Sequence, residues 1–197
     1  MHMGSLFSDE SWSPEGAVHL DFTSLEGTSC YLDPDAAKAI SRAIENQPLK
    51  AIHWIDSGDY HYLTALWLDK LERPAELLLL DHHPDDQPPA FGEGLLSCGG
   101  WVDYVRKNNP LVQKGAPEVY VSIDLDYLSR DFARTDWDQG DATLGEMLDG
   151  IRSVLAGRSL AGVDICGGIT SAKGATTEDY AVNRRTRMAL MDFFKAV

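Results

Sequence analysis

The sequence predicts an α/β fold in which a mostly parallel sheet is covered by helices on both faces. Short apolar stretches alternate with longer segments whose apolar residues recur every three or four positions. Such alternation is typical of βαβ units, in which crossover helices join parallel strands. With 197 residues, of which 44% are hydrophobic, the chain has the size and composition of one globular domain. We therefore expect a single domain over residues 1–197.

The expected strands are the short apolar segments. The stretch LLLLDHHPDD, residues 77–86, begins with four leucines and then changes to acids and histidines. A run of this kind is typical of a parallel strand that is buried on both faces. Segment 118–128 is rich in β-branched residues, which strands favour. The segments expected to form strands are 17–22, 49–56, 75–81, 118–128 and 160–168.

The expected helices lie between and after these strands. The first has Pro34 in its first turn, where proline is favoured, and another ends near Gly157, a residue that commonly terminates helices. In the last helix, Arg184, Arg185 and Arg187 are expected to lie on a solvated face. The segments expected to be helical are 33–46, 59–71, 99–108, 143–157 and 177–196.

The composition argues against several classes of partner. The net charge is −14, from 31 acidic residues against 17 lysines and arginines, whereas nucleic-acid binding needs a basic face. No apolar stretch is long enough to cross a bilayer, and no secretory leader is evident, so no membrane partner is expected. Cys30, Cys98 and Cys166 are an odd number without close pairing, which favours reduced thiols and a cytoplasmic location. A small molecule is the expected partner, and homo-oligomer formation stays open.

Acids and histidines follow three of the expected strands, at the end where open α/β sheets bind their ligands. Because alternate residues of a strand point to the same side, residues two apart in each motif are expected to converge. Carboxylates and imidazoles crowded together would call for divalent cations, and this mixture suits manganese or another first-row metal better than calcium or magnesium. The six candidate ligands are His61, Asp81, His83, Asp85, Asp124 and Asp126.

Each motif also has a structural interpretation. A histidine at a helix start, such as His61, commonly caps the helix, and an Asp-x-Asp pair after a strand commonly caps a loop. All three motifs in this order at strand ends favour a metal centre. Two ions about 3.5–4 Å apart would lower the pKa of bound water and generate hydroxide near neutral pH.

These motifs resemble those of the ureohydrolase superfamily, which includes arginase, agmatinase and formiminoglutamase. The matching segments are GDYH ending at His61, DHHPD at 81–85 and SIDLD at 122–126, and the resemblance spans about residues 50 to 170. It implies a three-layer α/β/α sandwich and two Mn²⁺ ions, with other divalent first-row metals as alternatives. It further implies a catalytic role for Asp85, which would orient the hydroxide as well as bind metal. One ion would be held by His61, Asp81, Asp85 and Asp124, and the other by Asp81, His83, Asp124 and Asp126.

Several features of the family are absent from the sequence. Members usually follow the SxDxD motif with Asp-Pro, where this chain has residues 127–130 of different type. Arginases carry a glutamate after the last core strand that binds the guanidinium, and Gly167 and Gly168 stand near that place. They also carry a proton-shuttling histidine in the region where this chain has Cys98. The chain is also short for the family, so reduced specificity loops are expected. We therefore expect a hydrolase of a C–N bond in a small guanidino, formimino or amide compound other than arginine.

Other functions fit parts of the pattern. A metal-binding protein without activity would keep the ligands and lose the substrate-binding groups. A manganese phosphoesterase with a DHH motif would need an upstream Asp-x-Asp motif and a second, glycine-rich domain. A zinc deacetylase related to arginase would need one metal and a pair of catalytic histidines, which the sequence lacks.

Further residues near the motifs have open roles. His82 is expected to face away from His83 and to make a buried hydrogen bond. Cys98 is expected to be a small buried residue, and Asp164 either contacts substrate or supports a metal ligand. Three aromatic residues either line the pocket or belong to the core: Tyr62, Trp101 and Trp137.

Overall fold

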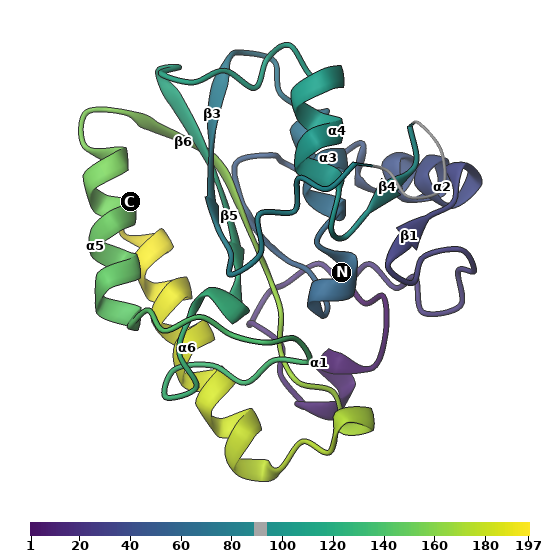
Figure 1. The fold of residues 1–197 in the computed structure, drawn as a ribbon, viewed down its shortest axis with the longest axis vertical. Coiled ribbons are helices and arrows are strands. Elements are labelled where there is room, and N and C mark those ends of the chain that lie inside the picture. Colours follow the sequence, from purple (N-terminus) through teal and green to yellow (C-terminus); the bar gives the residue numbers. More distant parts are fainter. Residues whose placement is uncertain (89–93) are drawn as a thin grey trace.

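The computed structural model describes residues 1–88 and 94–197. A sheet of four parallel strands lies between two layers of helices, which confirms the predicted α/β fold (Figure 1). The order of the strands across the sheet is β2, β6, β5, β3. Their bounds are Ile52–Trp54 for β2, Ala75–Leu80 for β3, Glu118–Asp124 for β5 and Ser159–Cys166 for β6.

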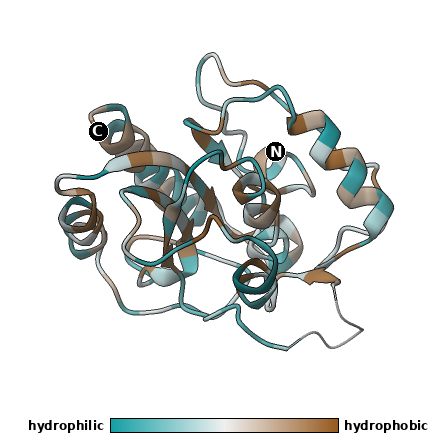
Figure 2. Ribbon diagram, turned by 90° about the horizontal axis from the view of Figure 1, so that it is seen from above, coloured by the Kyte–Doolittle hydropathy of each residue, from teal (hydrophilic) through white to brown (hydrophobic). Residues whose placement is uncertain are grey.

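Two apolar clusters hold the layers together. One cluster joins one face of the sheet to α5 (Leu144–Leu155) and α6 (Thr177–Lys195). The other cluster joins the opposite face to α2 (Pro34–Ile44), α3 (Leu63–Leu68) and α4 (Trp101–Asn108). In α2 the buried residues are spaced four apart, and hydrophobic and hydrophilic residues alternate along the helix (Figure 2). Within the described residues, no helix combines the length and apolarity needed to cross a bilayer.

The remaining elements are short. Helix α1 spans Leu6–Asp9, and β1 (Tyr31–Leu32) pairs antiparallel with β4 (Leu96–Ser97). Three 3₁₀ turns cover Gly58–Tyr60 (η1), Leu125–Tyr127 (η2) and Ser171–Lys173 (η3). Capping boxes at Thr143 and Thr176 fix the first turns of α5 and α6, because each hydroxyl and the acid three residues later satisfy backbone amides.

Three predictions about the fold are wrong. Segment 17–22 is described throughout and forms no strand, only an isolated bridge at Asp21, because it runs along the surface with Val18 exposed. The leucines of β3 are half-buried rather than fully buried, because β3 is an edge strand of the sheet. The predicted helix 59–71 is divided into η1 and α3, and this break places His61 at the end of η1.

The predicted solvation of α6 holds for Arg184 and Arg185 but is wrong for Arg187. The guanidinium of Arg187 is 1% exposed, forms an ion pair with Glu10, and donates a hydrogen bond to the Gly167 carbonyl oxygen at 2.8 Å. Helix α6 packs against the sheet and against the segment that follows α1, so the helix face carrying Arg187 has no access to solvent.

Candidate metal centre

The structure brings the six predicted residues together at the carboxyl end of the sheet. Asp124 is the last residue of β5, and Asp126 lies in the 3₁₀ turn η2 directly after it. Asp81 follows the last residue of β3, and Asp85 lies four residues beyond. His61, at the end of η1, points toward these acids.

His61 is the buried centre of one group of ligands. Its Nδ1 atom lies 3.0 Å from Asp81 Oδ2, 3.1 Å from Asp85 Oδ2 and 3.9 Å from Asp124 Oδ2. Despite these short distances, the Nδ1 atom forms no hydrogen bond of acceptable geometry within the described part of the chain. A buried imidazole nitrogen surrounded by carboxylate oxygens is well placed to bind a cation.

His83 belongs to a second, more open group. Its Nδ1 atom lies 2.9 Å from Asp126 Oδ2 and 3.6 Å from Asp81 Oδ1. On the other side of the ring, Nε2 lies 3.2 Å from an oxygen of Asp138, which is exposed. The His83 side chain is about one-third exposed, so this group faces the solvent side of the site.

The acids converge through turns and not through strand alternation, which corrects the predicted reason for their proximity. Strand β3 ends before Asp81, whose carboxylate accepts a hydrogen bond from the His83 backbone amide. Asp85 has a φ of 45°, a conformation that is unusual for a residue other than glycine. The indole of Trp101 donates a hydrogen bond of 2.7 Å to Asp85 Oδ2 and fixes it beside His61.

Two glycines leave room for the Asp124 carboxylate. A Cβ atom at Gly58 would lie 2.8 Å from Asp124 Oδ2, and one at Gly167 would lie 2.4 Å from Oδ1. Gly167 also has a φ of 92°, which side chains rarely adopt. Gly167, one of the two glycines noted after the last core strand, is therefore needed for the site, and this backbone has no space for an acidic side chain there.

The crowding of carboxyl groups shifts their pKa values. Burial, together with the charges of Asp124 and Asp81, raises the pKa of Asp126 to about 10. Burial also raises the pKa of Asp124 and of Asp85. For His61 burial works in the opposite direction, but the surrounding thiol and carboxyl groups outweigh it and raise the pKa well above its usual value. Asp124, Asp126 and Asp85 therefore hold their protons more strongly than free aspartates do, and a cation bound among them would displace those protons.

The donor atoms fit a pair of divalent cations. His61, Asp81 and Asp85 offer ligand atoms within 4.8 Å of one another, and so do Asp81, His83 and Asp126. Both groups include Asp81, whose Oδ2 atom lies near His61 and whose Oδ1 atom lies near His83, so this carboxylate would serve both positions if ions were bound. The unpartnered Nδ1 atom of His61 supports the same conclusion. Nitrogen and carboxylate oxygen donors of this kind suit first-row divalent metals.

A polar side chain contacts the Nε2 atom of each histidine, Ser122 for His61 and Asp138 for His83. His61 Nε2 lies 2.9 Å from the Ser122 hydroxyl, which donates to Asp164 at 2.8 Å. Asp164 is fully buried, so of its two predicted roles the structure favours support of a ligand. The sequence predicted no role for Ser122 or Asp138, although Ser122 lies in the SIDLD segment noted above. The signal was available in the serine of SIDLD and in the acidic loop 135–141.

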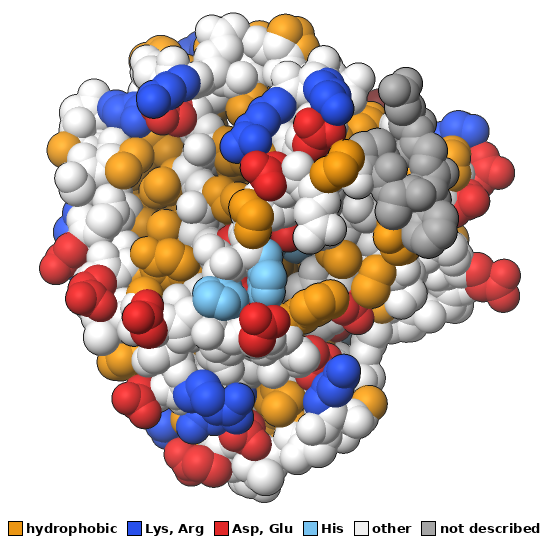
Figure 3. Space-filling view, in the orientation of Figure 1, with side chains coloured by type: hydrophobic (Ala, Val, Ile, Leu, Met, Phe, Trp, Pro, Cys, Tyr) orange, Lys and Arg blue, Asp and Glu red, His pale blue; other side chains and the backbone are white. Residues whose placement is uncertain are grey.

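A cavity of about 360 Å³ opens onto the site. Trp137 lines it, whereas Tyr62 and Trp101 are fully buried in the core. Cys98 also lines the cavity and is half-buried, so the prediction of a small buried residue is wrong for its burial. Histidine and acidic side chains gather near the middle of this face of the molecule (Figure 3). His82 is exposed rather than buried, and its ring approaches Asp138 at 3.7 Å, because the chain turns after β3 instead of continuing as a strand.

Comparison with known proteins identifies the fold. No protein-family model matches the chain. An uncharacterized protein from Thermotoga maritima is 28% identical over 144 residues, which cover 59% of this chain and 57% of that protein. The matched part therefore spans less than two-thirds of the relative.

Several solved structures share the architecture. A hypothetical agmatinase from Burkholderia thailandensis has a TM-score of 0.58 and 17% identity, over 85% of this chain and 68% of that chain. Proclavaminate amidino hydrolase from Streptomyces clavuligerus has a TM-score of 0.58 and 16% identity, over 83% and 70%. Arginase from Medicago truncatula has a TM-score of 0.54 and 17% identity, over 80% and 65%. The chain therefore has the fold of the ureohydrolase superfamily.

Proposed function

We propose that the protein is a hydrolase of C–N bonds that uses two divalent first-row cations, with Mn²⁺ as the expected metal. The observation that carries this proposal is the pair of donor groups that share Asp81. Two cations so placed lower the pKa of water, supply a nucleophile near neutral pH and offset negative charge in the transition state. The similarity in fold to an agmatinase, an amidino hydrolase and an arginase supports this class of chemistry.

The side chains of the cluster have separable tasks in the proposal. Ser122 orients His61 and Asp138 orients His83, each through the Nε2 atom of the ring. Asp85 would both bind a cation and accept a hydrogen bond from the attacking water, since its Oδ2 atom is fixed by Trp101 inside the site. The first ion would be held by His61, Asp81, Asp85 and Asp124, and the second by Asp81, His83, Asp124 and Asp126.

The rest of the cavity favours an uncharged substrate. All the acids among its described lining residues belong to the ligand set, and the other lining groups include Tyr31, Gln87, Ser97 and Trp137. A buried guanidinium needs an anionic partner, and at Gly167 the close approach of Asp124 leaves no room for one. We therefore place small amides ahead of cationic guanidino and formimino compounds, with arginine disfavoured.

The test is turnover by the Mn²⁺-loaded protein on a panel of small amides, formimino compounds and guanidino compounds, followed by release of ammonia, amine or urea. We expect hydrolysis of an amide, which is lost in Asp85→Asn and kept in Asp149→Asn, a variant of an exposed acid on α5. Two bound ions without turnover of any compound would contradict the hydrolase and leave a metal-binding protein. Hydrolysis of a phosphodiester or pyrophosphate alone would show a phosphoesterase instead.

A further inference from the structure

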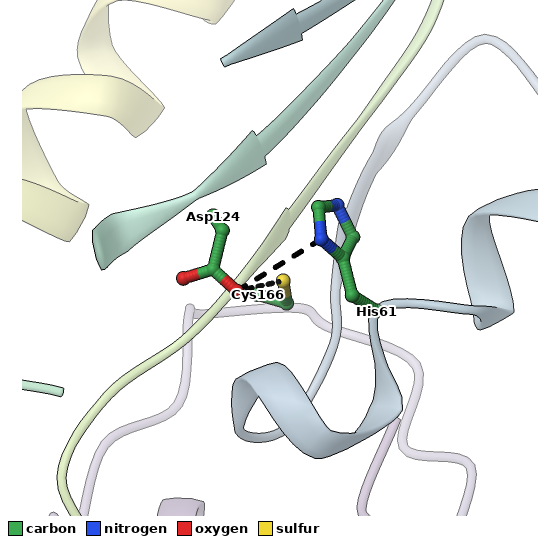
Figure 4. A group of neighbouring side chains, drawn as sticks. All are labelled: His61, Asp124 and Cys166. Atoms are coloured by element: carbon green, nitrogen blue, oxygen red, sulfur yellow. Dashed lines mark hydrogen bonds and ion pairs between the residues drawn. The ribbon is translucent and has the colours of Figure 1, made fainter. Parts of the chain in front are cut away.

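Cys166 lies inside the candidate metal centre. It is the last residue of β6, and it stands opposite Asp124 in the pairing of β6 with β5. Its Sγ atom is 3.1 Å from Asp124 Oδ2, and the residue is fully buried. Figure 4 shows that the contacts of Cys166 and His61 end at the same carboxylate oxygen of Asp124.

The three side chains form a third group of donor atoms. Ligand atoms of His61, Asp124 and Cys166 all lie within 4.8 Å of one another. With bonds of about 2.0–2.3 Å to nitrogen, oxygen and sulfur, one ion would contact all three after small adjustments of the side chains. This group shares His61 with the group of Asp81 and Asp85, so both describe the surroundings of one cation.

A purely structural role for the thiol does not account for the arrangement. A buried cysteine commonly packs as a small apolar residue, and here its S–H group donates to Asp124. That hydrogen bond gives no partner to His61 Nδ1, which stays unsatisfied within the described structure although the ring is 1% exposed. A cation between the three groups satisfies the nitrogen, the carboxylate and the sulfur together.

We propose that Cys166 is a thiolate ligand of the cation held by His61. The inference rests on the proposed metal centre and adds a ligand to it. When the ion binds, a metal–sulfur bond forms and the thiol proton passes to solvent. The two positions then differ in chemistry. Among the described residues, the His61 position has nitrogen, oxygen and sulfur donors, whereas the His83 position has nitrogen and oxygen donors.

The difference predicts unequal metal preference. Thiolate ligands favour softer ions, so the His61 position is expected to prefer zinc, cobalt or iron(II) over manganese. The His83 position keeps the preference for manganese that histidine and carboxylate ligands confer. A centre loaded from a mixture would therefore contain two different metals.

Cobalt serves as a spectroscopic probe of the thiolate ligand. Metal-depleted full-length protein is titrated with Co²⁺ while absorbance and bound cobalt are followed. We expect a near-ultraviolet thiolate-to-cobalt charge-transfer band that saturates at one equivalent. The band should disappear in Cys166→Ser while cobalt still binds, and it should persist in Cys98→Ser, since Cys98 lines the cavity but is not in the donor group.

The possible failures are distinguishable. Cobalt binding to the wild type without the band would overturn the role of Cys166 and leave the metal centre intact. A band that persists in Cys166→Ser would also overturn it. No cobalt binding by folded wild-type protein would overturn the metal centre itself. If Cys166→Ser does not fold, X-ray absorption of zinc-loaded wild type decides the matter, because a thiolate places sulfur at about 2.3 Å from zinc.

Discussion

The Nε2 atom of His61 lies 2.9 Å from the hydroxyl oxygen of Ser122, and this contact sets the orientation of the imidazole. The Ser122 hydroxyl donates to Asp164, so its oxygen accepts the Nε2 proton of His61. Thr64 donates to the same Asp164 oxygen at 3.1 Å and completes a buried chain. With one proton held on Nε2, Nδ1 is the ring nitrogen that faces the acids, and it would lose its own proton when a cation binds.

Removal of the serine hydroxyl should weaken metal binding without unfolding the protein. In Ser122→Ala, His61 loses its fixed orientation, and we expect metal affinity to fall about 10–100-fold, the usual effect of losing such a partner. Competition with a coloured chelator measures the affinity. Ser153→Ala, on the exposed face of α5, should leave it unchanged. Equal affinities for the two variants would show that the contact does not support the ligand.

Gly167 should not tolerate a side chain. The Cβ atom in Gly167→Ala would lie 2.4 Å from Asp124 Oδ1, and the residue would keep an unfavourable φ of 92°. We expect a loss of about 1–3 kcal/mol in the free energy of unfolding from the backbone conformation alone, and a displaced Asp124 that binds metal poorly. Urea unfolding and metal titration check both effects. Gly150→Ala is the control, because its Cβ atom would meet only open space among the described residues.

The stability of chelator-treated protein should fall as pH rises. Burial raises the pKa of Asp126 to about 10 in the folded chain, whereas an unfolded aspartate has a pKa of about 3.9. The folded state therefore binds the proton more tightly, and its contribution to stability is lost progressively from about pH 4 to about pH 10. Burial also raises the pKa of Asp164, to about 6, which acts in the same direction over the acidic part of that range.

The measurement is the urea midpoint across this pH range, with chelator and with excess Mn²⁺. Added Mn²⁺ should remove most of the slope, because the cation replaces the protons. Asp126→Asn should flatten the slope in chelator. A midpoint that rises with pH in chelator would contradict the assigned pKa directions.

The buried ion pair of α6 should contribute strongly to stability. In Arg187→Ala, Glu10 stays buried without its partner, and we expect a loss of about 3–5 kcal/mol in the free energy of unfolding. Replacing both residues, as in Glu10→Leu with Arg187→Met, should cost less than the single change. Arg185→Ala, whose guanidinium is exposed, should change stability by about 0.5 kcal/mol or less. Urea unfolding of the variants measures these losses of stability. Similar losses for Arg185→Ala and Arg187→Ala would contradict the prediction.

Much of the fold could be predicted from local patterns in the sequence. Apolar runs identify β3 and β5 because the strands of a parallel sheet pack against helices and need little polar alternation. The position of β3 at the edge of the sheet could not be predicted, because strand order depends on which strands the crossovers bring together. The burial of Arg187 depends on Glu10, a residue far away in sequence, so the helical pattern of α6 alone does not reveal it.

The residues of the candidate site could be predicted from the sequence, but their geometry could not. Carboxylates and histidines after strands indicate a cation whatever turns connect them, and the six predicted residues do lie together. The left-handed turn at Asp85 and the exposure of His82 follow from a chain reversal that strand periodicity does not describe. Cys166 was overlooked because a cysteine in an apolar strand looks like a core residue until Asp124 is placed beside it.

The most direct test of the binuclear centre is the metal content of protein loaded with Mn²⁺ and freed of excess metal, measured beside Asp124→Ala. We predict about two ions per wild-type chain, since two donor groups share Asp81, and a marked loss in the variant, which lacks a carboxylate that we propose as a ligand of both ions. Circular dichroism establishes that both proteins are folded. Wild-type protein that is folded and binds no Mn²⁺, or a variant that keeps both ions, would contradict the binuclear centre.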